Sequence, residues 1–121
     1  MAASLELTIS LKRDGENVSG FPVTRRLEVD ETAAFDNEEA TGGGFVTVPT
    51  GELDEINVLL VRVDQQVTIR LDGQTDAGIV LNAGGMLFIL DADIDAGAST
   101  NVTVSNGSGS TVNIRGLAGG T

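Results

Sequence analysis

The sequence predicts an all-β protein, a single jelly-roll-like or Greek-key β-sandwich of about eight short antiparallel strands. Apolar and polar residues alternate with a period of two over most of the 121 residues, which is the pattern of strands with one buried face. Glycine-rich segments separate these runs, and no long stretch shows the spacing of an amphipathic helix. The length suits one domain with a single core.

The first two strands are predicted at 5–11 and 23–30, with a turn at 14–17 between them. In the first strand leucine and isoleucine alternate with polar residues, so one face is expected to be buried and the other to be wet. Arg25 falls on the apolar side of the second strand and is expected at a sheet edge. Residues 1–4 are interpreted as a flexible N-terminal arm.

The middle of the chain changes character at 30–44, which is acidic and then glycine-rich. It is interpreted as a long exposed loop, with a short helical turn at 32–35. A short strand at 45–48 ends before Pro49. Residues 56–63 are apolar without alternation, which favours a strand that is covered on both faces.

The second half continues with short strands and ends in polar, glycine-rich sequence. Residues 116–121 are interpreted as a flexible C-terminal tail, so the predicted sandwich domain covers 5–115. The last two strands are expected to form a hairpin around an Asn-Gly turn. The predicted strands are 67–71, 79–81, 86–94, 102–104 and 112–114.

The composition argues against catalysis and against several classes of ligand. The chain has no His, Cys, Trp or Tyr, which removes Ser–His–Asp and Cys–His arrangements and the rings that usually stack on sugars. The net charge of −11 opposes binding to nucleic acid or to an anionic membrane surface. No cofactor and no catalytic residue are predicted, and an acidic, metal-stabilised enzyme ranks last. The core or an interface is expected to hold Phe21, Phe35, Phe45 and Phe88.

Three carboxylates at a spacing of two are weak candidates for a metal site, namely Asp91, Asp93 and Asp95. The spacing resembles the start of a calcium-binding EF-hand loop, but Ala96 and Val102 occupy the positions that need glycine and glutamate. On a strand the alternation would place all three on one wet face. A solvated face is therefore the preferred interpretation, with calcium at a loop or subunit contact as the alternative.

The charges are unevenly distributed along the chain. Half of the 18 acidic residues lie between residues 28 and 55, where there is no Lys or Arg. A solvated loop that keeps the protein soluble explains this, as does a high-salt environment. The sharper hypothesis is a contact between the acidic segment of one subunit and the basic pair of the next, which would build a ring or trimer head to tail. The expected homo-oligomer is a trimer or dimer. The candidate interface residues are Arg25, Arg26, Glu31, Asp36, Glu38 and Glu39.

The layout resembles small tailed-phage virion proteins of the jelly-roll kind, in particular capsid decoration (cement) proteins. The likeness is carried by the opening LELTISLKRDG, by the central VTIRLDG and GIVLNAGG, and by the closing VTVSNGSGS. The resemblance implies a non-enzymatic homo-oligomer that binds the major capsid protein on the capsid surface and stabilises the shell. None of the quoted segments is a binding motif, so no functional residue is implied.

The alternative that the resemblance leaves open is a phage head-fibre or tail component that acts as a host-surface binding module. The lack of Trp and Tyr counts against sugar recognition and so against this alternative. No basic leader precedes an apolar run, and the apolar runs are too short to cross a membrane. The protein is therefore expected to be made in the host cytoplasm, and the resemblance implies that it is located in the virion.

Overall fold

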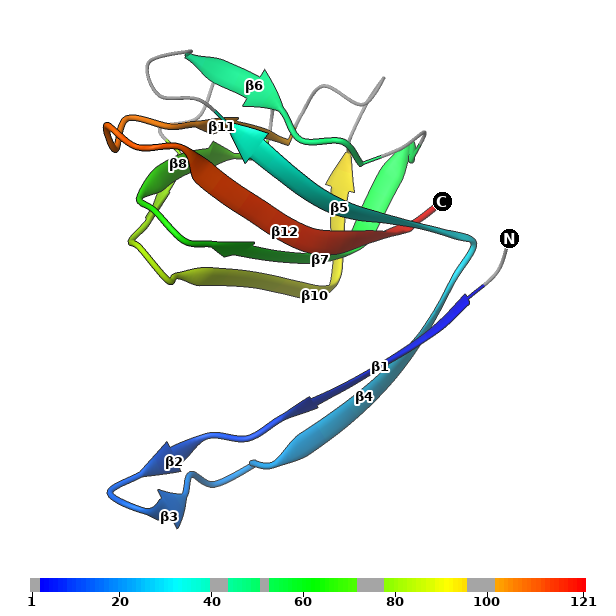
Figure 1. Ribbon diagram of the computed structural model, residues 1–121. Coiled ribbons are helices and arrows are strands. Elements are labelled where there is room, and N and C mark those ends of the chain that lie inside the picture. The colour runs from blue at the N-terminus through cyan, green and yellow to red at the C-terminus, as the bar shows by residue number, and fades with distance from the viewer. Residues whose placement is uncertain (1–2, 40–43, 51–52, 72–77, 96–101) are drawn as a thin grey trace.

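The described residues form twelve strands, which divide between a compact sandwich and a projecting arm (Figure 1). A computed structural model describes residues 3–39, 44–50, 53–71, 78–95 and 102–121. Within these ranges all regular structure is β, which confirms the predicted all-β class. The described residues include no helix that is long and apolar enough to cross a membrane.

The sandwich contains eight of the strands in two four-stranded antiparallel sheets. The first sheet has the order β10-β7-β12-β5 and the second the order β6-β11-β8-β9. The strands are β5 (Glu31–Glu39), β6 (Phe45–Thr47), β7 (Glu55–Val63), β8 (Val67–Arg70), β9 (Ile79–Leu81), β10 (Met86–Asp95), β11 (Thr103–Ser105) and β12 (Val112–Gly120).

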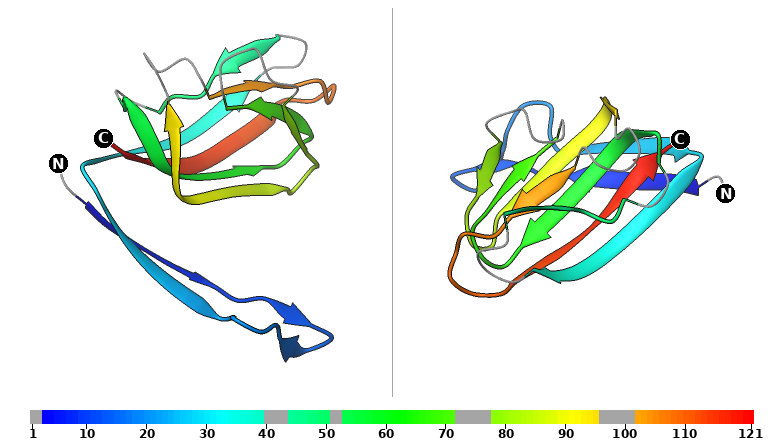
Figure 2. Two further views of the ribbon diagram at one scale, coloured as in Figure 1. Left: turned by 180° about the vertical axis from the view of Figure 1, so that it is seen from behind. Right: turned by 90° about the horizontal axis from the view of Figure 1, so that it is seen from above.

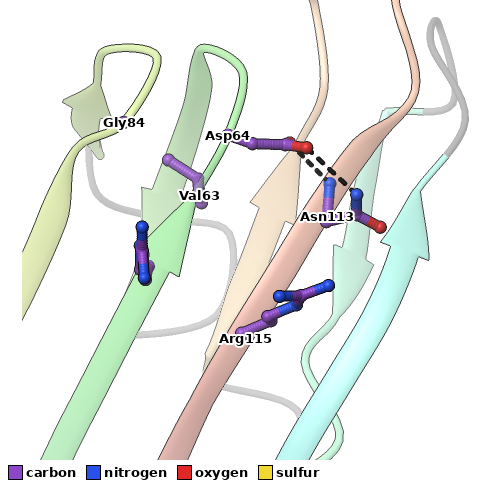
Figure 3. A pocket seen from close by; sticks show the side chains of 6 residues that line it. Val63, Asp64, Gly84, Asn113 and Arg115 are labelled. Atoms are coloured by element: carbon purple, nitrogen blue, oxygen red, sulfur yellow. Dashed lines mark hydrogen bonds between the residues drawn. The ribbon is translucent and has the colours of Figure 1, made fainter.

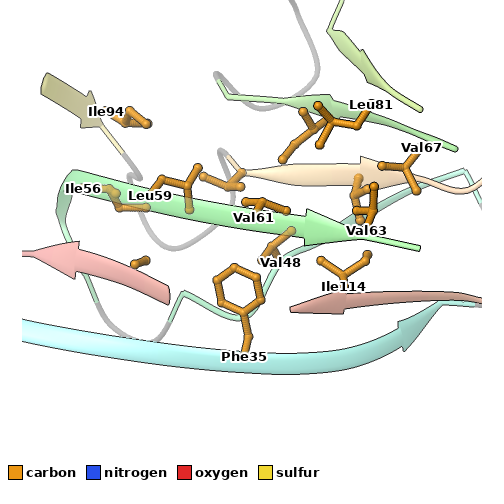
Figure 4. Close-up of a cluster of buried hydrophobic side chains, with 14 of the residues drawn as sticks. Phe35, Val48, Ile56, Leu59, Val61, Val63, Val67, Leu81, Ile94 and Ile114 are labelled. Carbon is orange, nitrogen blue, oxygen red and sulfur yellow. The ribbon is translucent and has the colours of Figure 1, made fainter. Parts of the chain in front are cut away.

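The core fills the space between the two sheets with aliphatic side chains and one aromatic ring (Figure 4). Ile56 and Leu59 on β7 and Ile69 on β8 are fully buried. The central strand β7 is covered on both faces along much of its length, as its unbroken apolar run predicts. Phe35 on β5 closes the cluster from the edge of the first sheet.

The arm is formed by the first four strands, which project away from the sandwich (Figures 1 and 2). Its strands are β1 (Ala3–Ile9), β2 (Lys12–Arg13), β3 (Glu16–Asn17) and β4 (Val23–Val29). β1 pairs with β4 over its full length, and β2 pairs with β3 at the tip. The two predicted strands are confirmed, but they form the arm and not part of the sandwich.

The expectation of a loop at 30–44 is wrong where the structure describes it, because Glu31–Glu39 is the edge strand β5. No helical turn forms at 32–35. The segment 31–39 is rich in acidic residues, but its side chains alternate with a period of two. Ala33 and Phe35 face inward while Ala34 and Asp36 face outward. β5 is held by antiparallel pairing along the whole of β12, which supplies the order that the local sequence does not.

The expectation of a flexible tail from residue 116 is also wrong, because Gly116–Gly120 continues β12 between β5 and β7. Thr121 is also held by backbone hydrogen bonds. Thr121 donates its N–H to the carbonyl of Glu55 at 3.0 Å, and its own carbonyl accepts from the N–H of Asp54 at 2.8 Å. Glycine in this segment reflects close packing of neighbouring strands.

The predicted hairpin between the last two strands does not form, although both strands exist. β11 pairs with β6 and β8 in the second sheet, whereas β12 pairs with β5 and β7 in the first. The Ser-Gly-rich segment therefore crosses from one sheet to the other. Interpretations of residues 1–2, 40–43, 51–52, 72–77 and 96–101 lie outside the described residues.

Candidate functional site

One face of the arm is apolar and the other is polar. In the β1–β4 register Leu5 lies opposite Leu27, and Ile9 lies opposite Val23. Side chains of directly opposed residues in an antiparallel pair point to the same face. The apolar face therefore holds Ala3, Leu5, Leu7, Ile9, Val23, Leu27 and Val29, with Arg25 as its one charged member. The polar face holds Ser4, Glu6, Thr8, Thr24, Arg26 and Glu28.

The outer face of the first sheet is the surface of the β10-β7-β12-β5 sheet that points away from the core. Its residues fall into three transverse rows, because the printed registers align the four strands. The row nearest the base of the arm holds Leu90, Val58, Gly119 and Thr32. The middle row holds Phe88, Leu60, Leu117 and Ala34. The far row holds Met86, Arg62, Arg115 and Asp36.

The base of the arm packs on the first of these rows. A Cβ atom built on Gly119 would lie 3.1 Å from Cδ1 of Leu5 and 3.3 Å from Cγ2 of Val29. Val58, beside Gly119, is 2% exposed, and Val29 is 6% exposed. Both stand outside the main core cluster. A second, smaller apolar contact therefore joins the arm to the outer face.

Towards the far row this face is open. Met86 and Phe88 are each 48% exposed, while their neighbours Leu87 and Ile89 turn inward against the core. Large apolar side chains that are exposed together on one face of a sheet indicate a surface that contacts a partner. The sequence placed Phe88 in the core or an interface, and the structure places it on the surface.

The candidate interface residues are separated by the fold into two groups. Arg25 and Arg26 lie on β4 of the arm, and the four acidic residues are distributed along β5. Arg25 donates to Asp91 at 2.7 Å, which ties the arm to β10, and Arg26 donates to Glu6 at 2.9 Å within the arm. These exposed pairs orient the arm and contribute little stability.

Among the acidic candidates, Asp36 accepts a hydrogen bond from Nε of Arg115 at 3.1 Å. Glu31 and Glu38 are exposed and Glu39 is half-buried. β5 is the edge strand of its sheet, so its charges discourage uncontrolled pairing with another strand. The intersubunit contact predicted for these residues stays a prediction.

A shallow depression lies at the far row (Figure 3). It is lined by the side chains of Arg62 and Arg115, which are directly opposed on β7 and β12. The end of a turn also lines it. Asp64 in that turn accepts hydrogen bonds from the backbone N–H of Asn113 at 2.7 Å and from its Nδ2 at 3.0 Å. Two guanidinium groups on one open surface suit a carboxylate of a partner protein.

The backbone N–H of Asn113 holds the pKa of Asp64 below its ordinary value of 3.8. Burial opposes this shift, and the side-chain amide of Asn113 adds to it. A carboxyl with a lowered folded pKa contributes stability that is present above its ordinary pKa and is lost as the pH falls through the lowered value. The bond that ties this turn to β12 is therefore complete at neutral pH and weakens only in acid.

The chemical shift of the Asp64 carboxyl carbon, followed by NMR as the pH is lowered, should accordingly have its midpoint at a pH below 3.8. In Asn113→Ala most of this depression is expected to remain, because the backbone donor, the larger cause, is unchanged. A return to the ordinary value in Asn113→Ala would show that the side-chain amide carries the shift and would contradict the assignment.

Of the three weak metal candidates, the structure describes the side chain of Asp91 alone, so the metal site stays a prediction. Asp91 has a positive φ of 56° and bonds to Arg25, and the register of β10 shifts between Leu90 and Ile94. The side chains of Asp93 and Asp95 lie outside the described residues. Among the described residues no group of three possible ligands could hold a metal ion.

No protein-family model, curated protein or solved structure matches this chain. The candidate site therefore rests on the geometry of the arm and the outer face.

Proposed function

We propose that this chain is a non-enzymatic bacteriophage structural protein, a capsid decoration protein that oligomerises on the capsid surface and stabilises the shell. The observation that carries the proposal is the arm. It is a projection with one apolar face, whose base packs on the sandwich of the same chain and whose outer part diverges from it (Figures 1 and 2). Such an element suits a protein that binds an adjacent protein molecule through a projecting apolar surface.

The strand pairing supports the jelly-roll form of the sandwich. The first strand of the sandwich pairs with the last, β5 with β12, and the second with the second-last, β6 with β11. The next pairs inward are β7 with β10 and β8 with β9. This is the pairing of one long hairpin rolled into two sheets, as in jelly rolls, which recur in viral capsid proteins. The step from this fold to a virion role is an analogy.

The test uses shells of the phage that encodes the chain, stripped of this protein. The purified chain is expected to sediment with the shells, to saturate, and to raise their resistance to heat. Leu7→Asp, which places a carboxylate on the apolar face of the arm, should weaken this binding. Thr8→Asp adds the same charge to the polar face and is the matched control.

Binding to host cells without binding to shells would overturn the proposal in favour of a head-fibre or tail component. Equal binding by Leu7→Asp and wild type would remove the arm from the contact.

A further inference from the structure

The arm lacks a cover for most of its apolar face. A two-stranded ribbon is marginally stable in water unless its apolar side packs against something else. In this chain Leu5 and Val29 at the base lie against Gly119, and Arg25 further along the arm bonds to Asp91 of β10. Leu7, Ile9 and Val23, further towards the tip, are only half-buried.

The surface that matches the arm is the remainder of the outer face. At the base the arm already packs on this face, around Val58. The middle row offers the same kind of side chain, and Phe88 in that row and Met86 in the far row are exposed, but the arm diverges from them (Figures 1 and 2). Each chain thus carries an apolar face on the outer part of the arm and exposed apolar residues on the outer face of the sheet. Both surfaces continue from the existing contact between the base of the arm and Val58.

The charge distribution favours the arm as the element that reaches a second copy. Residues 3–29 contain four acidic and four basic residues, so the arm has no formal net charge. The rest of the chain contains 14 acidic and three basic residues and carries the whole net charge of −11. Two such bodies repel each other, whereas a neutral arm can cross between them.

We propose that two copies of this chain exchange arms. Beyond its base, the apolar face of each arm lies on the outer face of the partner's β10-β7-β12-β5 sheet, and the polar face remains in water. The contact is reciprocal, so a two-fold arrangement closes it and leaves no unpaired arm. The inference rests on the proposed function, because it assigns the neighbour that the arm grips: a second copy of the chain on the shell.

The size of the contact sets its strength. The paired part of the arm is seven residues long, about 23 Å at ~3.3 Å per residue, but its base already packs on the sandwich of its own chain. The remaining parts of two such ribbons bury less than the roughly 1,200 Å² at which specific, stable interfaces begin. We therefore expect a dimer whose population rises with protein concentration.

The lack of cysteine in the chain allows a direct test. Leu7→Cys and Phe88→Cys are made as separate variants, mixed, and treated with a short bifunctional thiol cross-linker. Because each variant has one thiol, a Leu7–Phe88 product joins two chains. Thr8→Cys, on the opposite face of the arm, replaces Leu7→Cys in the control mixture. The first mixture should cross-link at least about tenfold faster, since the contact raises the effective concentration of the two thiols.

Native mass of the unlabelled chain supplies a second readout. Wild type and Thr8→Asp should form dimers as concentration rises, and Leu7→Asp should remain a monomer. Equal cross-linking of the two mixtures, or a monomer at all concentrations, overturns the exchange. If the chain then still binds shells, the proposed function stands and the arm grips the shell protein. Cross-linking without shell binding leaves the exchange intact and removes the proposed function.

Discussion

Replacing Gly116 by alanine is expected to prevent the sandwich from forming. A Cβ atom at this position would overlap the carbonyl oxygen of Leu60 and would lie 2.8 Å from Cζ of Phe35. The first atom is backbone of the central strand and cannot rotate away, so β12 would have to separate from β7. Overpacking of a core typically costs about 1–3 kcal/mol, and a clash with backbone in the middle of a sheet should exceed that range.

The measurement is denaturant unfolding followed by far-UV circular dichroism, because the chain has no Trp or Tyr for fluorescence. Gly107→Ala is the matched control. Its Cβ would meet no atom within 4 Å, so its unfolding free energy should change by less than about 1 kcal/mol. A Gly116→Ala protein with wild-type stability would show that β12 does not pack between β5 and β7 in this register.

Asn106→Ala is expected to produce the second largest loss of stability. Asn106 is 3% exposed, and its Nδ2 donates to the carbonyls of Glu39 at 2.9 Å and Ser110 at 2.7 Å. Its Oδ1 accepts from the backbone N–H and the hydroxyl of Ser108. The alanine leaves several of these groups without a partner, at about 1–3 kcal/mol for each that stays buried. We expect a total of about 3 kcal/mol.

The same unfolding experiment checks this value. Ser108→Ala removes one hydroxyl from the network and leaves the bonds from Asn106 to Glu39 and Ser110, so it should cost about 1 kcal/mol. If Asn106→Ala and Ser108→Ala were equally stable, the amide would not be the group that joins the β11–β12 segment to the end of β5.

The alternation of side chains was enough to predict most strands but not their partners. Leu5, Leu7 and Ile9 alternate with polar residues just as a strand at the surface of a sandwich does. A period of two reports that one face is apolar, and it is silent about what covers that face. Whether a strand belongs to the sandwich or to a free-standing arm is decided by contacts with residues far away in sequence.

Charge and glycine misled in a related way. The acidic residues of 31–39 and the glycines of 116–120 lower the local preference for strand, yet 31–39 pairs along its full length with 112–120. Phe35 covers Gly116, where a side chain would not fit. Each segment is ordered by the other, and such mutual dependence is invisible in a local pattern.

The candidate site shows the same division. The unequal charge distribution could be read directly, and it already set the bases at Arg25 and Arg26 apart from the acidic run. The exposure of Met86 and Phe88 could not be predicted from the sequence, because their strand is apolar on both faces. Only the pairing of β10 with β7 shows which of its side chains face the core and which face outward.

By itself, the sequence determined that this protein is built from strands, that it is strongly acidic, and that it lacks the residues of common catalytic sites. These properties follow from composition and from periodicities a few residues long. The tertiary structure alone decided that the first strands leave the sandwich as an arm and that an apolar sheet face stays open beside it. Both depend on pairings between distant strands, such as β12 with β5 and β7, whose stability arises only when the whole sheet is assembled.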